Sequence, residues 1–452
     1  MDDRGMGFVS EQTMAMLVDL YELTMAQSYF REGRNETATF DLFIRPLPAR
    51  NFLVSAGLES VLVYLERMRF PEEGLAYLER LGLFDRAFLD HLRALRFTGN
   101  VRAIPEGEIF FATEPVLEVT APRIQAQIVE TFLLNQINCQ VTVASKAARV
   151  ALAAQGRPVI EMSPRRTHGT DAAMKAARSA YLAGCAGTSN VLAGMTYGIP
   201  IYGTMAHSYV MSFDDELTAF RTYARHFPDN CVLLIDTYDT VQGARQAAIV
   251  AGELRERGHR LRAVRIDSGD IADLSRRVRA VLDEAGFPEV QILASGDLNE
   301  HRIRALLADG APIDAFGVGT EIGVPSDAPT LGGVYKLVED ESGFRIKRSA
   351  GKITLPGRKQ VWRVLSGGRW VEDVIALDEE PAPPNGTPLL VEVMRDGRRL
   401  ASETLVQARE RCLSRLRELP APLLVPDGGT HPVRRSPGLD AVFHSMASAA
   451  SL

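Results

Sequence analysis

The sequence predicts an α/β protein in which an irregular βα barrel is joined to a smaller mixed α+β domain formed by N-terminal and C-terminal segments. Two observations support this fold class. Short apolar runs, each followed by Gly, Ser, Thr or Asp and then by a polar helical stretch, recur between about residues 124 and 340. This is the pattern of βα units around a parallel sheet. The chain on either side lacks the alternation and mixes helical and strand patterns.

We expect four regions along the chain. Residues 1–123 form the N-terminal mixed α+β domain, and residues 124–340 form the βα barrel with catalytic function, a length that suits this architecture. Residues 341–420 form a C-terminal segment that packs with the N-terminal domain. Residues 421–452 are rich in Pro, Gly, Ser and Ala, so we expect an extended or mobile tail there.

The first region alternates between helical and strand patterns. Residues 14–30 have apolar positions at helical spacing, and residues 38–45 have the composition of a strand. A Leu-rich helical stretch follows at residues 62–97. Residues 101–119 alternate as a strand does, with a turn signal at Pro105-Glu106-Gly107.

Further elements flank the barrel. A helix opens it at residues 124–138, where apolar residues recur at helical spacing. Beyond the barrel, residues 343–374 have the pattern of short strands and turns, and residues 402–419 have helical periodicity.

Four apolar runs in the barrel end in residues suited to phosphates, a ribose or Mg²⁺. The runs lie at residues 232–235, 263–266, 290–293 and 313–316. Because the carboxyl ends of parallel strands meet at one edge, we expect a binding site there. The candidate residues are Asp236, Arg265, Asp267, Ser268, Gly269, Gly296, Asp297, Gly317, Gly319 and Thr320.

His207 is the strongest catalytic candidate. It follows an apolar segment at residues 199–202, which we expect to be a buried strand, and the small residues Gly203, Thr204 and Ala206. Small neighbours allow a large phosphorylated substrate to approach an imidazole closely. An imidazole nitrogen attacks phosphorus when a neighbouring group fixes its tautomer, and Asp236 is our candidate for that orienting role.

Composition narrows the class of protein. The 452 residues are 46% hydrophobic and 24% charged, with a formal charge of −6, which disfavours a general nucleic-acid binder. No apolar run is long enough to span a bilayer and no signal peptide is recognisable, so we expect a cytoplasmic protein without membrane partners. The four cysteines lie far apart, and we expect neither zinc nor a disulfide: Cys139, Cys185, Cys231 and Cys412.

Six segments in order carry a resemblance to a known family. They are Asp19-Leu20-Tyr21-Glu22-Leu23-Thr24-Met25, Phe52-Leu53-Val54-Ser55-Ala56-Gly57-Leu58-Glu59, Gly187-Thr188-Ser189-Asn190-Val191-Leu192-Ala193-Gly194, Gly203-Thr204-Met205-Ala206-His207-Ser208, Ile266-Asp267-Ser268-Gly269-Asp270 and Ala294-Ser295-Gly296-Asp297. Together they resemble nicotinate phosphoribosyltransferase, a type II phosphoribosyltransferase, over about residues 14–365.

The resemblance implies a reaction and its cofactors. Nicotinate and 5-phosphoribosyl-1-diphosphate would give nicotinate mononucleotide and pyrophosphate, the first step of NAD salvage from nicotinate. ATP hydrolysis would drive the equilibrium through phosphorylation of His207. Asp267 would bind a ribose hydroxyl or Mg²⁺, and the backbone at Gly296, Gly317 and Gly319 would approach the ribose 5-phosphate, since glycine has no Cβ in the way.

The resemblance also implies how the base is held. A tyrosine like Tyr21 would contact the nicotinate ring across the interface of a homodimer with a shared active site. Arg165 would lie near the carboxylate of the base and the phosphates, because an arginine fork suits a carboxylate. The loop departs from the family's pattern at Ser163-Pro164, where a glycine and an apolar residue are usual, although both arginines remain.

Several alternatives stay open. Nicotinamide phosphoribosyltransferase has an aspartate where this chain has Ser189, and a serine hydroxyl donates to a carboxylate that an aspartate would repel, so Ser189 favours nicotinate. A noncatalytic nucleotide-binding homologue would not need His207, Asp236 and Asp267. An aldolase or isomerase would need a strand-end lysine in a context suited to a Schiff base, which we do not find, and it would leave His207 unexplained. A quinolinate phosphoribosyltransferase would need more basic residues for a second carboxylate.

Overall fold

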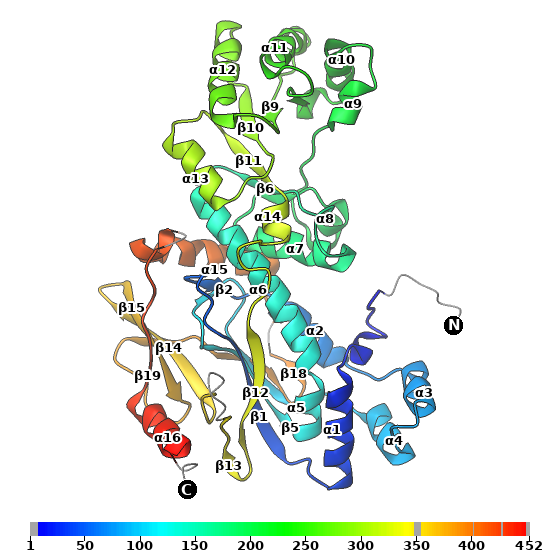
Figure 1. The fold of residues 1–452 in the computed structure, drawn as a ribbon, viewed down its shortest axis with the longest axis vertical. Coiled ribbons are helices and arrows are strands. Elements are labelled where there is room, and N and C mark those ends of the chain that lie inside the picture. The colour runs from blue at the N-terminus through cyan, green and yellow to red at the C-terminus, as the bar shows by residue number, and fades with distance from the viewer. Residues whose placement is uncertain (1–7, 348–353, 401, 426–427, 449–452) are drawn as a thin grey trace. The chain divides into compact units, whose positions relative to one another are not determined.

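The computed structural model of this chain describes residues 8–347, 354–400, 402–425 and 428–448, and it divides the chain into two compact units (Figure 1). The terminal unit comprises the chain up to Ser145 and from Asp327 onward. The central unit comprises Lys146–Ser326. Each unit has its own hydrophobic core.

The central unit contains a six-stranded parallel sheet, which confirms the α/β class. The strand order is β7-β6-β11-β10-β9-β8, and no strand pairing joins the edge strands β7 and β8 within this fully described unit. The strands are β6 (Val159–Glu161), β7 (Gly187–Thr188), β8 (Val232–Leu234), β9 (Ala263–Ile266), β10 (Gln291–Ala294) and β11 (Ala315–Val318).

Helices follow the strands of this sheet in the expected βα order. They are α7 (Thr170–Leu182), α8 (Val191–Tyr197), α9 (His207–Met211), α10 (Glu216–His226), η2 (Pro228–Asn230), α11 (Thr240–Glu256), α12 (Ile271–Glu284), α13 (Glu300–Ala308) and α14 (Thr320–Gly323). Helix α11 packs against α10 and α12. The core beneath them includes Leu233, Val264 and Ile292, all fully buried. Consecutive strand residues are buried, as a parallel sheet with both faces covered requires.

The terminal unit contains antiparallel sheets. A seven-stranded sheet has the order β13-β12-β1-β5-β3-β17-β18, a four-stranded sheet has the order β16-β14-β15-β19, and β2 pairs with β4. The strands are β1 (Thr37–Ile44), β2 (Leu53–Val54), β3 (Asn100–Ala103), β4 (Ile109–Phe110), β5 (Pro115–Pro122), β12 (Gly333–Asp340), β13 (Gly343–Phe344), β14 (Lys359–Ser366), β15 (Arg369–Leu377), β16 (Gly386–Pro388), β17 (Val391–Arg395), β18 (Arg398–Arg399) and β19 (Val433–Arg435).

The helices of the terminal unit come from both ends of the chain. They are η1 (Met14–Met16), α1 (Leu20–Arg31), α2 (Leu58–Arg67), α3 (Glu72–Arg80), α4 (Arg86–Ala94), α5 (Arg123–Ile128), α15 (Leu405–Glu418), η3 (Ala421–Leu424) and α16 (Pro437–Ser448). Helix α6 (Glu130–Ala153) contains the boundary between the two units.

The unit boundaries differ from the expected positions at residues 123 and 340. Helix α5 packs against β1 and β5, and β12 pairs antiparallel with β1 from Phe43 opposite Val334 to Ala38 opposite Asp340. Residues 124–145 and 327–340 therefore belong to the terminal unit, which is the larger of the two. Long-range strand pairing, invisible in a local pattern, sets this boundary.

The expectation of an extended or mobile tail is wrong for residues 433–448. Strand β19 pairs parallel with β15, and α16 follows it. The Glu380 carboxylate accepts hydrogen bonds from the backbone N–H groups of Gly438 and Leu439 and from the Ser436 hydroxyl. A carboxylate distant in sequence thus caps this helix, which composition did not reveal.

The expected buried strand at residues 199–202 is also wrong. Ile201 forms only an isolated parallel bridge with Thr188, and the side chains of Ile201 and Tyr202 are 55% and 46% exposed. The bridge adds to β7, which is an edge strand, so this segment has a neighbour on one side alone.

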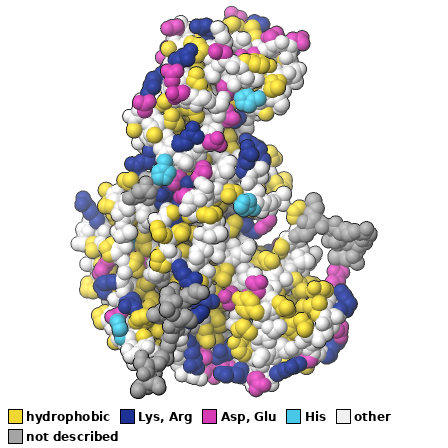
Figure 2. Space-filling model, viewed as in Figure 1, with side chains coloured by type: hydrophobic (Ala, Val, Ile, Leu, Met, Phe, Trp, Pro, Cys, Tyr) yellow, Lys and Arg dark blue, Asp and Glu magenta, His cyan; other side chains and the backbone are white. Residues whose placement is uncertain are grey.

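Two further properties of the described residues are the distribution of their charges and the length and polarity of their helices. Figure 2 shows acidic and basic side chains interspersed over the face that it draws. None of the helices within the described ranges combines the length and apolar character that crossing a bilayer needs.

Candidate active site

Hydrogen bonds connect the loops that follow β8, β9 and β10. The Asp236 carboxylate accepts hydrogen bonds at Oδ2 from the Asp267 backbone N–H, at 2.9 Å, and from the Ser268 hydroxyl, at 2.6 Å. The Ser295 backbone N–H donates to the Ile266 carbonyl. Because β8, β9 and β10 are neighbours in the sheet, these loops meet at its carboxyl edge, as the sequence predicts.

Arg265, Asp267 and Ser295 form a compact charged network. Arg265 and Asp267 point to the same side of β9 because they are two residues apart. Arg265 Nη2 donates to Asp267 Oδ1 at 2.6 Å, and its Nε donates to Ser295 Oγ at 2.8 Å. The Ser295 hydroxyl donates to the same Asp267 oxygen at 2.5 Å. Arg265 Nη1 also reaches the Thr204 hydroxyl at 3.1 Å.

This network controls the acidity of Asp267. Burial alone raises the pKa of the carboxyl, but the hydrogen bond from Ser295 and the charge of Arg265 outweigh burial, so the pKa of Asp267 lies below its usual value. Asp267 therefore remains a carboxylate at neutral pH. Its Oδ1 accepts the hydrogen bonds from Arg265 and Ser295, and its Oδ2 accepts neither of them.

His207 begins α9 and faces the loops after β8 and β9. Its Nδ1 lies 3.1 Å from the Thr237 hydroxyl. Its Nε2 lies 4.0 Å from Asp236 Oδ1 and 3.9 Å from Asp267 Oδ2. The His207 side chain is 39% exposed, whereas that of Asp236 is 1% exposed. A solvent-accessible imidazole thus lies against one buried and one half-buried carboxylate.

Asp236 approaches His207 without a hydrogen bond. The 4.0 Å separation exceeds hydrogen-bond length, and Asp236 Oδ1 is buried with no hydrogen-bond partner among the described atoms. The direct partner of the ring is Thr237, which follows Asp236 in the chain and which sequence reasoning missed. A hydroxyl directly after a strand-end aspartate is the signal that was available.

A cavity of about 360 Å³ lies beside this network. Eight predicted residues line it: Arg165, Arg265, Asp267, Gly296, Asp297, Gly317, Gly319 and Thr320. Lining residues that we did not predict are Met162, Arg166, Ser295, Leu298 and Glu321. The predicted residues Ser189, His207, Asp236, Ser268 and Gly269 belong to the same unit but are absent from the lining.

Two glycines that line this cavity lie very close to neighbouring atoms of the protein. Gly296 has a φ of 88°, and a Cβ there would lie 1.9 Å from the Asp267 carbonyl oxygen. A Cβ at Gly317 would lie 2.7 Å from Met162 Sδ. The close approach of the loops after β9 and β10 therefore requires glycine at position 296, whereas at position 317 the neighbouring atoms belong to the flexible Met162 side chain.

The loop after β6 presents two arginines to the cavity. The Glu161 carboxylate, fully buried, accepts hydrogen bonds from the Ser163 backbone N–H and the Thr188 hydroxyl, both at 2.5 Å. The Arg166 N–H donates to the Ser163 carbonyl at 2.7 Å and closes the turn. The Ser163-Pro164 departure is thus compatible with an ordered turn in which Arg165 and Arg166 are exposed.

Two predicted contacts to the base lie elsewhere. Ser189 follows β7; its N–H donates to the Glu161 carbonyl at 2.9 Å, and its buried hydroxyl has no hydrogen-bond partner among the described atoms. Tyr21 belongs to α1 of the terminal unit and is exposed. Burial of its phenol and the nearby carboxylates of Glu130 and Glu22 raise the pKa of Tyr21.

Asp267 offers one carboxylate oxygen that suits Mg²⁺ when a phosphorylated substrate supplies further oxygen ligands. Asp267 Oδ2 is the carboxylate oxygen that the Arg265 and Ser295 hydrogen bonds leave available. The described residues contain no group of three or more His, Cys, Asp or Glu side chains suited to a metal. Mg²⁺ commonly binds through one or two carboxylates together with substrate phosphates and water.

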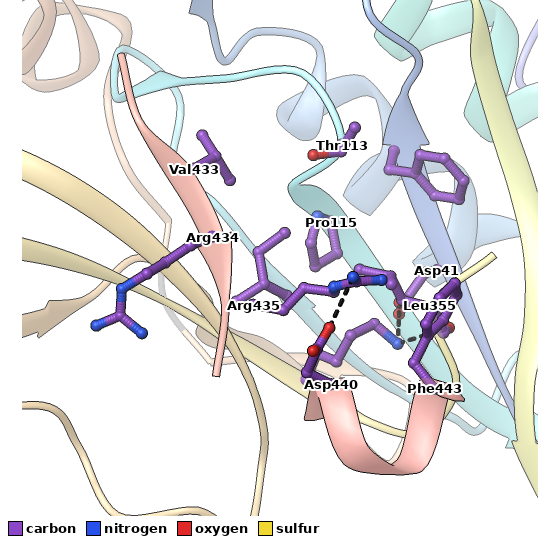
Figure 3. A pocket seen from close by; sticks show the side chains of 12 residues that line it. Asp41, Thr113, Pro115, Leu355, Val433, Arg434, Arg435, Asp440 and Phe443 are labelled. Carbon is purple, nitrogen blue, oxygen red and sulfur yellow. Dashed lines mark hydrogen bonds and ion pairs between the residues drawn. The ribbon is translucent and has the colours of Figure 1, made fainter. Parts of the chain in front are cut away.

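A second cavity, of about 530 Å³, lies in the terminal unit among β1, β5, β14, β15, β19 and α16 (Figure 3). Its described lining cations are paired with carboxylates: Lys359 with Asp41, Arg435 with Asp440, and Arg434 with Glu372. None of the predicted site residues lines it. Lys359 is buried in its ion pair with Asp41.

Comparison with known proteins identifies relatives along most of the chain. Residues 16–138 match the profile described as the nicotinate phosphoribosyltransferase N-terminal domain, and residues 158–337 match that of the nicotinate phosphoribosyltransferase family. The chain is 49% identical over 430 residues to nicotinate phosphoribosyltransferase pncB2 of Mycobacterium tuberculosis, covering 94% of this chain and 92% of that protein. It is 43% identical over 381 residues to nicotinate phosphoribosyltransferase of Bacillus subtilis, covering 82% and 77%.

A solved structure shares the fold. The crystal structure of human nicotinic acid phosphoribosyltransferase aligns with a TM-score of 0.83 at 29% identity, covering 95% of this chain and 99% of that one.

Proposed function

The chain belongs to the nicotinate phosphoribosyltransferase family, and on that premise we propose that it joins nicotinate to 5-phosphoribosyl-1-diphosphate and releases nicotinate mononucleotide and pyrophosphate. The observation that carries the proposal is the cavity at the carboxyl edge of the parallel sheet, which is lined by three arginines and three carboxylates: Arg165, Arg166, Arg265, Asp267, Asp297 and Glu321. Guanidinium groups bind phosphates and carboxylates accept hydrogen bonds from hydroxyls, so this mixed lining suits a substrate that carries several phosphates and ribose hydroxyls.

The reaction requires that the two substrates be positioned and that the charges developing on the ribose and the pyrophosphate be stabilised. The ring nitrogen of nicotinate attacks the anomeric carbon while the bond to pyrophosphate breaks, and positive charge develops on the ribose. Arginines at the cavity stabilise the leaving pyrophosphate, and Asp267 binds a ribose hydroxyl or Mg²⁺. When bound, Mg²⁺ would neutralise pyrophosphate oxygens, with Asp267 as its protein ligand.

ATP coupling through His207 is the second part of the proposal. An exposed imidazole with a hydroxyl on one nitrogen and carboxylates near the other has the access and orientation that a nucleophile needs. We propose that ATP phosphorylates His207 and that hydrolysis of this phosphohistidine drives the equilibrium toward nicotinate mononucleotide.

Selection of the acid over the amide depends on Ser189 in this proposal. Its buried, unpartnered hydroxyl is free to donate to the nicotinate carboxylate. A nicotinamide phosphoribosyltransferase remains the alternative, in which the same hydroxyl would accept from the carboxamide.

The proposal extends to assembly and cellular role. We propose a homodimer with a shared site, in which the exposed Tyr21 of one protomer contacts the nicotinate bound by the other. The reaction would be the first step of NAD salvage from nicotinate, in the cytoplasm.

The test is product formation from 5-phosphoribosyl-1-diphosphate and Mg²⁺ with nicotinate or nicotinamide, with and without ATP, for the wild type and His207→Ala. We expect turnover of nicotinate that ATP raises in the wild type and leaves unchanged in the variant. Turnover of nicotinamide instead would exclude the acid as substrate. No turnover of either base would favour a noncatalytic homologue.

A further inference from the structure

The second cavity, in the terminal unit, has the size and the walls of a small-molecule site. Its volume is about 530 Å³. Ligand pockets of this size are lined mainly by apolar side chains, with a few polar groups that orient the ligand. The apolar lining here comes from elements distant in sequence: Phe43, Pro115, Leu355, Ile375, Val433 and Phe443.

The charged side chains of the described lining neutralise one another. Lys359 Nζ lies 2.8 Å from Asp41 Oδ2, and both side chains are only 2% exposed. Arg435 Nη2 lies 2.6 Å from Asp440 Oδ1. The remaining lining cation is paired with a carboxylate that does not line the cavity. A neutral ligand therefore enters more favourably than an ion, which would lose its hydration without gaining an opposite charge.

One polar atom of the lining residues lacks a partner. Asp41 Oδ1 is buried and has no hydrogen-bond partner among the described atoms. The Lys359 ammonium is already occupied, since it also donates to the Leu355 and Pro356 carbonyl oxygens at 3.1 and 3.3 Å. Burial raises the pKa of Asp41, and the charge of Lys359 opposes that rise. A ligand that donates a hydrogen bond to Asp41 would stabilise its carboxylate form.

Two phenyl rings give the cavity an aromatic character. Phe43 comes from β1 and Phe443 from α16. The Arg435 guanidinium lies over the Phe443 ring, 4.3 Å from its centroid. Phenyl rings favour offset or edge-to-face contact with other aromatic rings. A planar aromatic body therefore suits these walls better than a flexible aliphatic one.

We propose that the second cavity binds a small neutral aromatic molecule that donates one hydrogen bond to Asp41. Its ring packs against Phe43 and Phe443, and its N–H or O–H group supplies the donor that Asp41 Oδ1 lacks. Such a ligand connects β1 with α16, the helix that Glu380 caps. None of the residues assigned to substrates in the proposed function lines this cavity.

The experiment compares three probes on the full-length wild type by saturation-transfer NMR titration: indole, 1-methylindole and indole-3-carboxylate. Indole is neutral and donates one N–H bond. The methylated probe keeps the ring without the donor, and the carboxylate probe adds a negative charge. Backbone hydrogen exchange in α16, followed by mass spectrometry, reports whether the bound probe contacts that helix.

Two variants test the location of the probe. Val433→Phe places a ring in the cavity, because Val433 lies two residues before Arg435 in β19 and shares its side of the strand, while Arg434 points away (Figure 3). Val371→Phe is the matched control, since Val371 belongs to the neighbouring strand β15, is 47% exposed and does not line the cavity.

We expect indole to bind the wild type and to slow hydrogen exchange in α16. 1-Methylindole should bind at least about 10-fold more weakly, because Asp41 receives no donor from it. Indole-3-carboxylate should also bind at least about 10-fold more weakly, because no unpaired cation compensates its charge. Val433→Phe should weaken indole binding at least about 10-fold, and Val371→Phe should match wild type.

Four results would overturn the inference: no binding of indole, equal affinities for indole and 1-methylindole, equal or tighter binding of indole-3-carboxylate, or indole binding that neither slows exchange in α16 nor responds to Val433→Phe. The comparison of probes needs wild type alone, so it decides the role of Asp41 even if Val433→Phe does not fold.

Discussion

Ser189 places a single hydroxyl where the proposed reaction distinguishes nicotinate from its amide. We predict that Ser189→Asp lowers kcat/KM for nicotinate at least about 100-fold, because a second carboxylate repels that of the substrate at a site partly shielded from water. Ser189→Ala should lower it only about 10-fold, since it removes one hydrogen bond to a charged group. Steady-state kinetics with both bases measures the effect.

Activity toward nicotinamide provides the internal control for folding. An aspartate accepts a hydrogen bond from a carboxamide, so Ser189→Asp should retain or gain turnover of nicotinamide. Equal kinetics of wild type and Ser189→Asp with both bases would contradict the role given to Ser189.

The ionisation of Asp267 gives a pH prediction. Burial raises its pKa, and the Ser295 hydrogen bond and the Arg265 charge lower it further than burial raises it. Removing the hydroxyl in Ser295→Ala takes away the largest lowering contribution, so the pKa of Asp267 should rise. The acidic limb of the pH profile of kcat/KM should then move to higher pH by up to about one unit.

Ser275→Ala serves as the comparison for that profile, because among the described residues the hydroxyl of Ser275 donates only to the Ala272 carbonyl within α12. Its acidic limb should overlay that of wild type. Coincident profiles for Ser295→Ala and wild type would show that Asp267 ionisation does not limit the reaction.

Some residues near the ends of strands could be placed at the cavity from the sequence. Arg265, Asp267 and Gly296 were all predicted, and all line the cavity. Ser295 and Thr237 were missed because their importance comes from partners 28 and 30 positions away, Asp267 and His207. Hydrogen bonds between loops leave no local signature in a sequence.

Helix α16 depends on Glu380 for its N-terminal cap. We predict that Glu380→Gln loosens β19 and α16, because the neutral amide is a weaker acceptor for two backbone N–H groups and the Ser436 hydroxyl. A loss of about 1 kcal/mol in local stability should speed backbone hydrogen exchange in residues 433–448 about fivefold. Hydrogen exchange followed by mass spectrometry measures this directly.

The neighbouring substitution Glu379→Gln should leave exchange in that segment unaltered, since Glu379 is exposed and no hydrogen bond of its side chain appears among the described residues. If both variants exchange like wild type, Glu380 is not the group that holds α16.

Element boundaries were set by local chemistry in some places and by packing in others. The helical region expected at residues 62–97 consists of three helices, α2, α3 and α4. Asp85 begins the last of them, because its side chain accepts a hydrogen bond from the Phe88 N–H. Such a cap is readable from sequence. The expected helix at residues 14–30 likewise divides, with α1 starting after Asp19.

A shared active site makes a prediction for the assembled protein. Tyr21→Ala and His207→Ala should each lose most ATP-stimulated activity. If Tyr21 of one protomer completes the site of the other, dimers formed from both variants contain one intact site in two. Coexpression should therefore restore about a quarter of the wild-type ATP-stimulated rate, since half of the dimers are mixed.

Coexpression of wild type with His207→Ala should give about half of the wild-type rate, because every site with an intact His207 also receives an intact Tyr21, and this value sets the scale for the complementation. Failure of the two variants to complement, in preparations shown by mass to contain mixed dimers, would place Tyr21 and His207 in sites of the same protomer or remove Tyr21 from the site.

The sequence by itself determined the α/β class, the order of βα units and the strand-end side chains, because alternating apolar runs and their terminal Gly, Ser and Asp residues are local patterns. The six ordered segments also determined the family. The tertiary structure alone decided that β12 joins β1, that Glu380 caps α16, and that Thr237 contacts His207. Each of these contacts joins residues at least 30 positions apart, and such contacts form only when the chain folds.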